Sequence, residues 1–148
     1  MLALTAFGVS TVDADPTEET PAAVGAASDY ALGKEALDAK DWASAIRFLS
    51  RAVIQDDRNP DLANLLGYAY RNAGRLDEAF RHYRAALQLN PRHRGAHEYI
   101  GEAYLLAGDL AKAEEHLAAL KQICVVTCEE WEDLEKAIAA YRGRRASP

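Results

Sequence analysis

Two cysteines, Cys124 and Cys128, are the only thiols in this 148-residue chain, and they lie four positions apart in the stretch ICVVTCEEW. Such a pair can form a structural disulfide, act as a redox-active dithiol or bind a metal ion. The spacing is not that of a CxxC motif, and the neighbouring Glu129 and Glu130 disfavour a thiolate. An even cysteine count favours the disulfide. A redox-active or metal-responsive module remains the alternative.

The histidines are the other candidates for chemistry. His93 and His97 are four positions apart, a spacing that places two rings on one helix face where a metal ion could bind. No third ligand is evident beside them, so we expect them to be surface or packing residues. The chain also contains no Gly-rich phosphate loop, no HExxH motif and no nucleophile elbow. The sequence therefore predicts no catalytic residue, no metal site and no cofactor.

Composition and charge limit the classes of partner. Hydrophobic residues make up 49% of the chain and charged residues 27%, and the net charge is −6. These values predict a soluble, mostly helical domain and disfavour nonspecific binding to nucleic acid or to anionic membranes. The basic run Arg92-His93-Arg94 is not interleaved with aromatic residues that would stack on bases. We expect neither nucleic-acid binding nor stable membrane insertion.

The first 27 residues differ in composition from the rest. Residues 1–14 contain a short apolar run, followed by the small-residue pattern Val12-Asp13-Ala14 that signal peptidase cuts after, although no basic residue precedes the run. Residues 15–27 are acidic and rich in Pro, Thr and Ala, which predicts a disordered linker. We expect an exported protein, located in the periplasm, and an oxidising compartment would suit the disulfide. A cytoplasmic protein with an ordinary leader is the alternative.

Beyond the linker the chain repeats itself every 34 residues. The recurring positions are Leu32-Gly33, Leu66-Gly67 and Ile100-Gly101 in one place, and Ala45, Ala79 and Ala113 in another. Gly74 and Gly108 separate two apolar-periodic halves of the second and third units, where a helix must end with positive φ, and Lys40 takes this place in the first unit. Each unit is therefore predicted to be a helical hairpin whose small residues let the helices approach closely.

The period and these residues resemble the tetratricopeptide repeat family, most closely in the second unit, LLGYAYRNAGRLDEAFRHYRAALQLNP. With the leader, the chain resembles exported bacterial members. The resemblance implies an all-α fold, an α-solenoid of three helix-turn-helix units at about residues 26–59, 60–93 and 94–127. The implied domain spans residues 28–142, and the tail of residues 143–148 is predicted to fray.

A capping helix is predicted over residues 128–142, because stacked hairpins need an end that is polar on its outer face. Thr127 and Glu130 have the spacing of a capping box, which starts the helix near Cys128. The apolar stripe of this helix comprises Trp131, Leu134, Ile138 and Tyr141. A disulfide from Cys124 to Cys128 would then fix the angle of the cap.

Stacked hairpins of this family present the first helix of each unit on a concave groove, and the resemblance implies that a peptide or partner protein binds there. Helical phase opposite the packed stripe gives the groove candidates Tyr30, Lys34, Asn64, Tyr68, Arg71, Asn72, Glu98, Glu102 and Leu105. The most suggestive cluster is Asn64, Tyr68, Arg71 and Asn72, since amides can hold a peptide backbone and a guanidinium can hold a carboxylate. An ordinary polar surface is the alternative.

A clamp for a terminal carboxylate is not expected. Members of the family that form one use Lys, Asn and Arg residues from three units. The matching positions here are Tyr30, Lys34, Leu65, Gly95 and Tyr99, and only Lys34 has suitable chemistry. The predicted function is therefore a non-catalytic protein-protein interaction scaffold or adaptor with an unknown partner, and self-association stays open.

Overall fold

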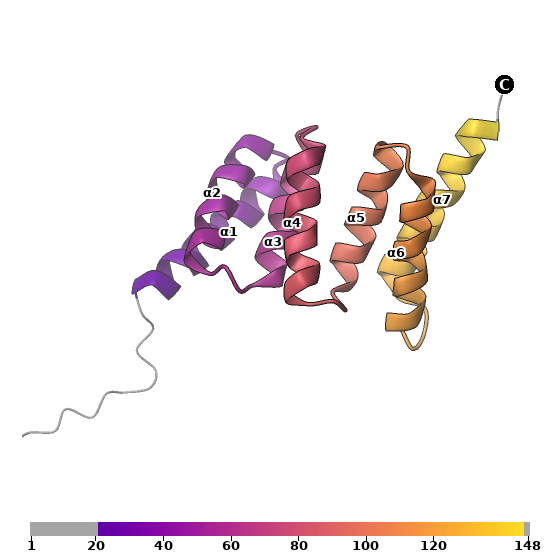
Figure 1. Ribbon diagram of the computed structural model, residues 1–148. Helices are drawn as coiled ribbons and strands as arrows, with labels where there is room; N and C mark the ends of the chain where they lie inside the picture. Colours follow the sequence, from indigo (N-terminus) through magenta and orange to yellow (C-terminus); the bar gives the residue numbers. More distant parts are fainter. Residues whose placement is uncertain (1–20, 147–148) are drawn as a thin grey trace, which may run out of the picture.

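The computed structural model describes residues 21–146, which form seven α-helices and no strand. The helices are α1 (Pro21–Asp38), α2 (Trp42–Gln55), α3 (Pro60–Asn72), α4 (Leu76–Leu89), α5 (Arg94–Leu106), α6 (Leu110–Ile123) and α7 (Glu129–Ala146). Consecutive helices pair into the hairpins α1–α2, α3–α4 and α5–α6, which stack along the molecule, and α7 closes the far end (Figure 1). The predicted all-α solenoid of three hairpins and a capping helix is confirmed.

The turn inside each hairpin forms as the sequence predicts. Gly74 and Gly108 have φ of 77° and 83°, and Lys40 takes the same left-handed place with φ of 57°. That conformation costs a residue with a Cβ atom about 1 kcal/mol. The next helix is then capped in two hairpins, where the carboxylates of Asp41 and Asp109 each accept a hydrogen bond at 3.1 Å from a backbone N–H three residues later.

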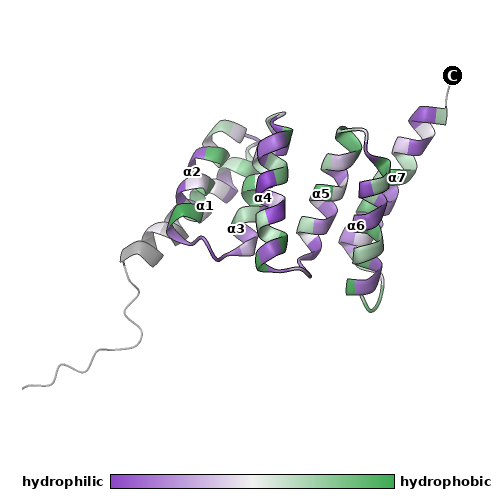
Figure 2. Ribbon diagram, viewed as in Figure 1, coloured by the Kyte–Doolittle hydropathy of each residue, from purple (hydrophilic) through white to green (hydrophobic). Residues whose placement is uncertain are grey.

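The core runs between the hairpins. All seven helices contribute buried hydrophobic residues. Figure 2 shows hydrophobic (green) and hydrophilic (purple) residues following one another along the helices. The largest fully buried side chains are Tyr83, Leu49, Leu66, Ile100, Leu120 and Leu134. Helices approach closely at Gly67, where an added Cβ would lie 2.7 Å from the Tyr83 ring, and at Gly101, where it would lie 2.7 Å from Leu134. The second contact joins α5 to α7, so the cap packs as part of the array.

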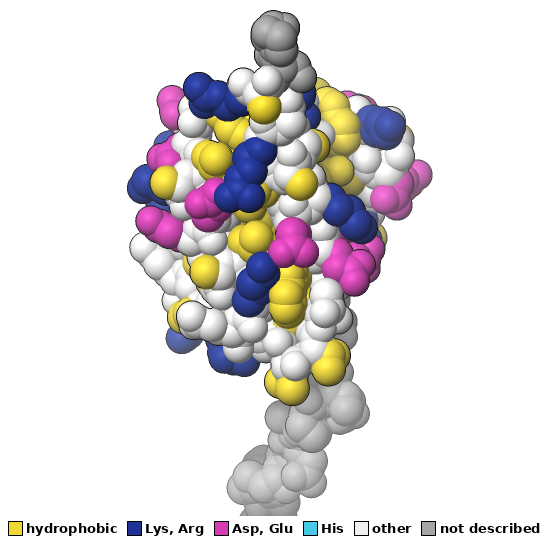
Figure 3. Space-filling model, turned by 90° about the vertical axis from the view of Figure 1, so that its right-hand side faces the viewer, with side chains coloured by type: hydrophobic (Ala, Val, Ile, Leu, Met, Phe, Trp, Pro, Cys, Tyr) yellow, Lys and Arg dark blue, Asp and Glu magenta, His cyan; other side chains and the backbone are white. Residues whose placement is uncertain are grey.

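The apolar stripe predicted for the cap is confirmed. Leu134 and Ile138 are buried, and the partly buried Trp131 and Tyr141 pack against the same cluster. The opposite side of α7 faces solvent. Figure 3 looks onto this end of the molecule and shows charged side chains of both signs around a narrow strip of hydrophobic ones.

Several predicted boundaries need correction. Helix α1 begins at Pro21, so the linker predicted for residues 15–27 is wrong from that residue onward, because its alanines continue the helix. Residues 1–20, with the predicted signal segment, lie outside the described residues. Helix α7 continues to Ala146, so most of the tail predicted to fray is helical, and its basic last turn suits the helix C-terminus.

The start of α7 also differs from the prediction by one residue. The helix begins at Glu129, and the Cys128 carbonyl oxygen accepts the first helical hydrogen bond, from the Glu132 N–H at 3.1 Å. Cys128 therefore holds the capping position that was predicted for Thr127. Between Pro21 and Ala146, no helix combines the length and the apolar character that crossing a membrane requires.

Candidate functional site

The first helix of each hairpin and α7 together line three pockets on one side of the stack. We call them the α1 pocket, the Asn64 pocket and the Arg71 pocket, with volumes of about 220, 270 and 330 Å³. The α1 pocket is lined by Lys34, Leu37, Asp38, Leu65, Tyr68 and Tyr99. The Asn64 pocket shares Leu65 and Tyr99 with it, so the two adjoin. The linings of all three pockets come only from α1, α3, α5 and α7, which makes this side a groove.

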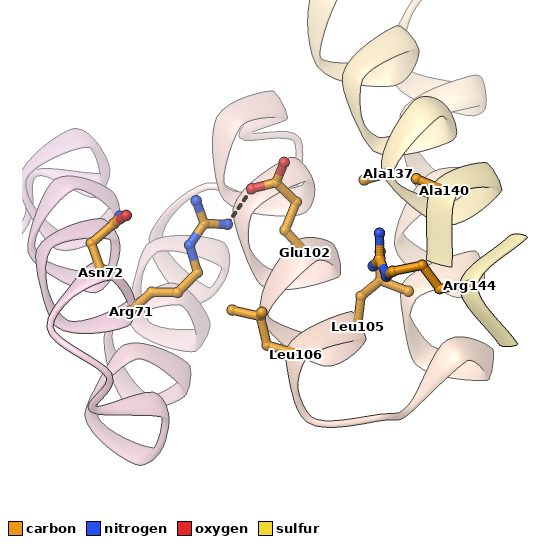
Figure 4. Close-up of a pocket in the computed structure, with 8 residues that line it drawn as sticks. All are labelled: Arg71, Asn72, Glu102, Leu105, Leu106, Ala137, Ala140 and Arg144. Carbon is orange, nitrogen blue, oxygen red and sulfur yellow. Dashed lines mark hydrogen bonds and ion pairs between the residues drawn. The ribbon is translucent and has the colours of Figure 1, made fainter. Parts of the chain in front are cut away.

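An ion pair lies at one side of the Arg71 pocket. The Arg71 guanidinium donates to the Glu102 carboxylate and, at 3.3 Å, to the Tyr99 carbonyl oxygen, and only 11% of its side chain is exposed (Figure 4). The guanidinium also lies 5.2 Å from the ring centroids of Tyr68 and Tyr99. The sequence suggested a guanidinium that is free to hold a carboxylate. This expectation is corrected, because Arg71 already has its own carboxylate and two aromatic neighbours.

The rest of the Arg71 pocket is largely apolar. Leu105, Leu106, Ala137 and Ala140 line it, and Arg144 approaches from α7 opposite α5 (Figure 4). Asn72 lies at the edge, exposed, and its side-chain amide donates to the Tyr68 carbonyl oxygen at 2.9 Å. This pocket therefore offers an apolar surface that is bordered by the Arg71–Glu102 ion pair and by Arg144.

Aromatic rings connect the hairpins beneath the groove. The Tyr68 ring lies 6.2 Å from Trp42 and 5.0 Å from Tyr99, measured between ring centroids, and Tyr99 lies 6.4 Å from Tyr83. Burial raises the pKa of Tyr99 to about 12 and that of Tyr83 further, so both hydroxyls stay neutral. The row gives the groove a rigid, partly apolar floor.

The Asn64 pocket contains a buried amide and several carboxylates. Asn64 is only 5% exposed, and its Oδ1 has no hydrogen-bond partner in the described structure. The carboxylates of Glu98, Glu129, Glu130 and Asp133 line the same pocket. Burial raises the pKa of Glu98 to about 8, and the negative charges of Glu102, Asp133 and Glu130 add to the shift. The pocket is polar and acidic, unlike the Arg71 pocket.

The structure distributes the predicted groove residues over the three pockets. Lys34 and Tyr68 line the α1 pocket, Asn64 and Glu98 the Asn64 pocket, and Arg71, Asn72, Glu102 and Leu105 the Arg71 pocket. The predicted cluster around Asn64 is thus divided between pockets. Tyr30 packs against the core cluster of the first hairpin, with the Lys34 ammonium 5.9 Å above its ring. Their role in binding stays a prediction.

Sequence reasoning missed the wall that α7 supplies. Glu129, Glu130 and Asp133 line the Asn64 pocket, and Ala137 and Arg144 line the Arg71 pocket. The 34-residue register contained the signal, because Asp133 occupies the repeat position of Leu65 and Tyr99, which also line the groove. The sequence interpretation treated the capping helix only as a solvent-facing end, and so it missed the contribution of α7 to the groove.

The candidate chemical residues lie away from the groove floor. Cys124 and Cys128 are joined by a disulfide across the turn from α6 to α7, with their Cα atoms 6.1 Å apart, and Val125 at the tip is fully exposed. The bond in the native protein stays a prediction. His93 caps α5 and contacts Asp61, with 2.9 Å between Nε2 and Oδ1.

His97 points to a different partner from His93. Its Nε2 donates to the Pro91 carbonyl oxygen at 3.0 Å, which leaves its Nδ1 to accept from His116 Nδ1–H at 2.9 Å. The metal pair considered for His93 and His97 is therefore not formed. Over residues 21–146, no group of three or more His, Cys, Asp and Glu side chains is arranged to hold a metal ion.

Comparisons with known proteins agree with this architecture. Two family models, each described as tetratricopeptide repeat, match residues 30–91 and 73–123, and together they extend from the middle of α1 to the end of α6. The chain belongs to the tetratricopeptide repeat family. Its repeats are 27% identical over 96 residues to the TPR repeat-containing thioredoxin TTL4 of Arabidopsis thaliana. That match covers 65% of this chain and only 13% of the relative.

Solved structures of other tetratricopeptide repeat proteins share the fold. The TPR2B domain of yeast Sti1 in its complex with pHsp70 superposes with a TM-score of 0.76 at 17% identity, covering 82% of this chain and 99% of that one. The type III secretion translocator chaperone SycD of Yersinia enterocolitica gives 0.75 at 16% identity, covering 88% and 90%. SycD in complex with a peptide of the translocator YopD gives 0.69 at 16%, covering 80% and 93%. At these identities the likeness shows the fold alone.

Proposed function

We propose that this tetratricopeptide repeat protein is a non-catalytic scaffold or adaptor that binds an extended segment of a partner protein in the groove along α1, α3, α5 and α7. The observation that supports it is the row of three pockets lined only by these helices. The similar folds of Sti1 and SycD were solved with pHsp70 and with a YopD peptide, which supports the same use of the fold.

The groove is suited to an extended chain because its floor is organised before binding. The Arg71–Glu102 ion pair and the contact between Tyr68 and Tyr99 hold side chains of α3 and α5 in place. A rigid site loses little conformational entropy when a peptide binds, so more of the contact energy appears as affinity. The α1 pocket and the Asn64 pocket adjoin, so neighbouring peptide side chains can occupy both.

A matched pair of tyrosines on α3 tests the groove. The probe is a peptide selected from a random library displayed against the wild-type protein, and its affinity is measured by fluorescence anisotropy. Tyr68→Ala should weaken binding by roughly tenfold or more, since it removes an aromatic wall of the α1 pocket. Tyr70→Ala, on the face that stacks on His82, should change affinity by less than about threefold. Equal losses in the two variants, with circular dichroism unchanged, would contradict the groove assignment.

We also propose that the protein is exported to the periplasm and that the disulfide between Cys124 and Cys128 is structural. The apolar segment in residues 1–14 and the short distance between the cysteines support this. Intact-mass analysis of the native protein should find a chain cleaved after Ala14 and lighter by two hydrogens. An uncleaved chain with two reactive thiols would favour the cytoplasmic alternative and a redox role.

A further inference from the structure

The Asn64 pocket contains an acceptor that the fold leaves unused. Asn64 lies on α3 and lines the pocket, and only 5% of its surface is exposed. Its Oδ1 nevertheless contacts no donor in the described structure. Buried polar atoms in proteins nearly always have a hydrogen-bond partner, so an unpaired one calls for an explanation. The oxygen has almost no accessible surface as it stands, so a ligand supplies the donor only when the amide turns about χ2.

Space beside Asn64 is kept open by Gly95. A Cβ atom at this position would lie 3.2 Å from Asn64 Nδ2, closer than side chains normally approach. Any other residue at the start of α5 would therefore press on the amide. Gly95 is one of the residues that line the cavity of about 270 Å³ between α3, α5 and α7.

The walls of this cavity are rich in negative charge. Glu98 comes from α5, and Glu129, Glu130 and Asp133 come from the first turns of α7. Two cations approach these carboxylates from the rim: Arg94 Nε lies 3.5 Å from Glu130, and Lys136 Nζ lies 3.2 Å from Asp133. Both are largely exposed, at 53% and 71% of their side chains, so their charges are screened by water. The carboxylates outnumber these cations, and the cavity is left with excess negative charge.

We infer that the Asn64 pocket binds the cationic side chain of a lysine or arginine in the partner's peptide. When the amide turns about χ2, Asn64 Oδ1 comes to face the cavity and accepts a hydrogen bond from the bound cation, and the carboxylates of Glu98 and Asp133 balance its charge. The inference rests on the proposed function, because the side chain arrives as part of a segment lying in the groove. It adds a specificity that the groove alone does not have, namely a partner segment with a basic residue placed over α5 and α7.

The raised pKa of Glu98 agrees with this assignment and gives it a second readout. With a pKa of about 8, Glu98 is mostly protonated at pH 7, and a cation placed beside it favours the carboxylate. Binding at pH 7 should then release up to about one proton per complex. The charged and titratable groups around Glu98 are Glu102, Arg71, Tyr99, Glu129, Glu130, Asp133, Arg94, Lys136 and His93.

Peptide selection with a charge-matched control tests the inference. Random peptides displayed against the wild-type protein should be enriched in lysine or arginine at one position. In a selected peptide, replacing that lysine with norleucine should weaken binding at least tenfold. The penalty should fall below threefold in the double variant Glu98→Gln, Asp133→Asn. The norleucine penalty should be retained in the control double variant Glu115→Gln, Asp77→Asn, which removes the same charges from exposed positions on α6 and α4.

Calorimetry gives a second test. Measured in buffers of different ionisation enthalpy, peptide binding to the wild-type protein should release protons, and Glu98→Gln should abolish this release.

The possible outcomes distinguish a failure of the cation pocket from a failure of peptide binding in the groove. Two results would overturn the cation pocket. One is a set of selected peptides with no enrichment in lysine or arginine. The other is a norleucine penalty that is equal in the wild-type protein and in the Glu98→Gln, Asp133→Asn variant. If those peptides still lose affinity in Tyr68→Ala, the groove function stands alone. If no selected peptide binds the wild-type protein more tightly than it binds Tyr68→Ala, both the groove and the pocket assignments fail.

Discussion

Asn64 opposes folding, and in the proposed cation pocket it would serve binding. A buried amide oxygen without a donor raises the free energy of the folded state by about 1–3 kcal/mol. Functional sites commonly keep such residues because stability and function favour different side chains. The same helix contributes Leu62, Ala63 and Leu66 to two hydrophobic clusters, which offset this cost.

Replacing Asn64 with leucine should therefore separate stability from binding. Asn64→Leu has a similar volume and no polar atom, so we expect the free energy of unfolding to rise by about 1 kcal/mol, measured by urea titration. The affinity for a lysine-containing groove peptide should fall at the same time. A variant that is less stable than the wild-type protein, or that binds equally well, would contradict the role given to Oδ1.

The paired imidazoles make a prediction about pH. Burial, with the nearby His97 and Lys112, lowers the pKa of His116 from its ordinary 6.5 to about 4. The unfolded chain binds this proton at a higher pH than the folded chain, so the contribution of His116 to stability is complete above pH 6.5 and is lost as the pH falls toward 4. Because the ring is partly exposed, we expect a loss of about 1–2 kcal/mol between pH 7 and pH 5. Urea titrations should show a shallower pH dependence for His116→Gln, and an unchanged one would refute the assignment.

Sequence reasoning reached the correct face of the helices but not the partners of each side chain. Helical phase placed Arg71 and Glu102 on the groove side, and both line the Arg71 pocket. Phase within one helix does not say which residues of two neighbouring helices meet. The ion pair between α3 and α5, and the burial of Asn64 against Gly95, depend on inter-helix registration and became visible only in the structure.

At the scale of elements, the capping helix has two roles. It covers the open end of the core with Leu134 and Ile138, and it supplies one wall of two pockets. The close contact of Leu134 with Gly101 fixes α7 against α5, while the disulfide joins the residue before α7 to the C-cap residue of α6. The angle of α7 therefore sets the width of the groove.

Removing the disulfide should loosen this element modestly. In Cys124→Ala, Cys128→Ala the closed loop is short, so we expect the free energy of unfolding to fall by about 2 kcal/mol or less. Urea titration measures the change. A reductant should lower the stability of the wild-type protein to a similar degree and leave the variant unaffected. If the reductant has no effect on the wild-type protein, the cysteines are not bonded in solution.

The repeat gave the element order reliably because each feature that defines it is local. The glycines at positive φ and the periodic apolar residues lie within one hairpin, and the 34-residue spacing repeats them from one hairpin to the next. Element ends were less predictable, as the extents of α1 and α7 show. The alanine-rich start of α1 reads equally well as a flexible linker or as a helix, and packing in the first hairpin is needed to decide between them.

At the scale of the whole molecule, the groove exists only because four helices from different repeats align. No pair of helices contains all the groups that line the Asn64 pocket, which draws on α3, α5 and α7. Repeat arrays gain stability from contacts between neighbouring units, so the same stacking that buries the core also assembles the proposed binding surface. A partner that binds here should bridge several units and stabilise the array as a whole.

The location of a bound peptide tests this account most directly. Two-dimensional NMR of the ¹⁵N-labelled protein, titrated with a library-selected peptide, reports which backbone amides sense binding. The account predicts the largest shift changes at Leu65, Tyr68, Tyr99 and Asp133, on α3, α5 and α7. Amides on the outer faces of α2, α4 and α6 should change little. Shift changes concentrated on those outer helices at saturation, with the groove amides unmoved, would contradict the central claim.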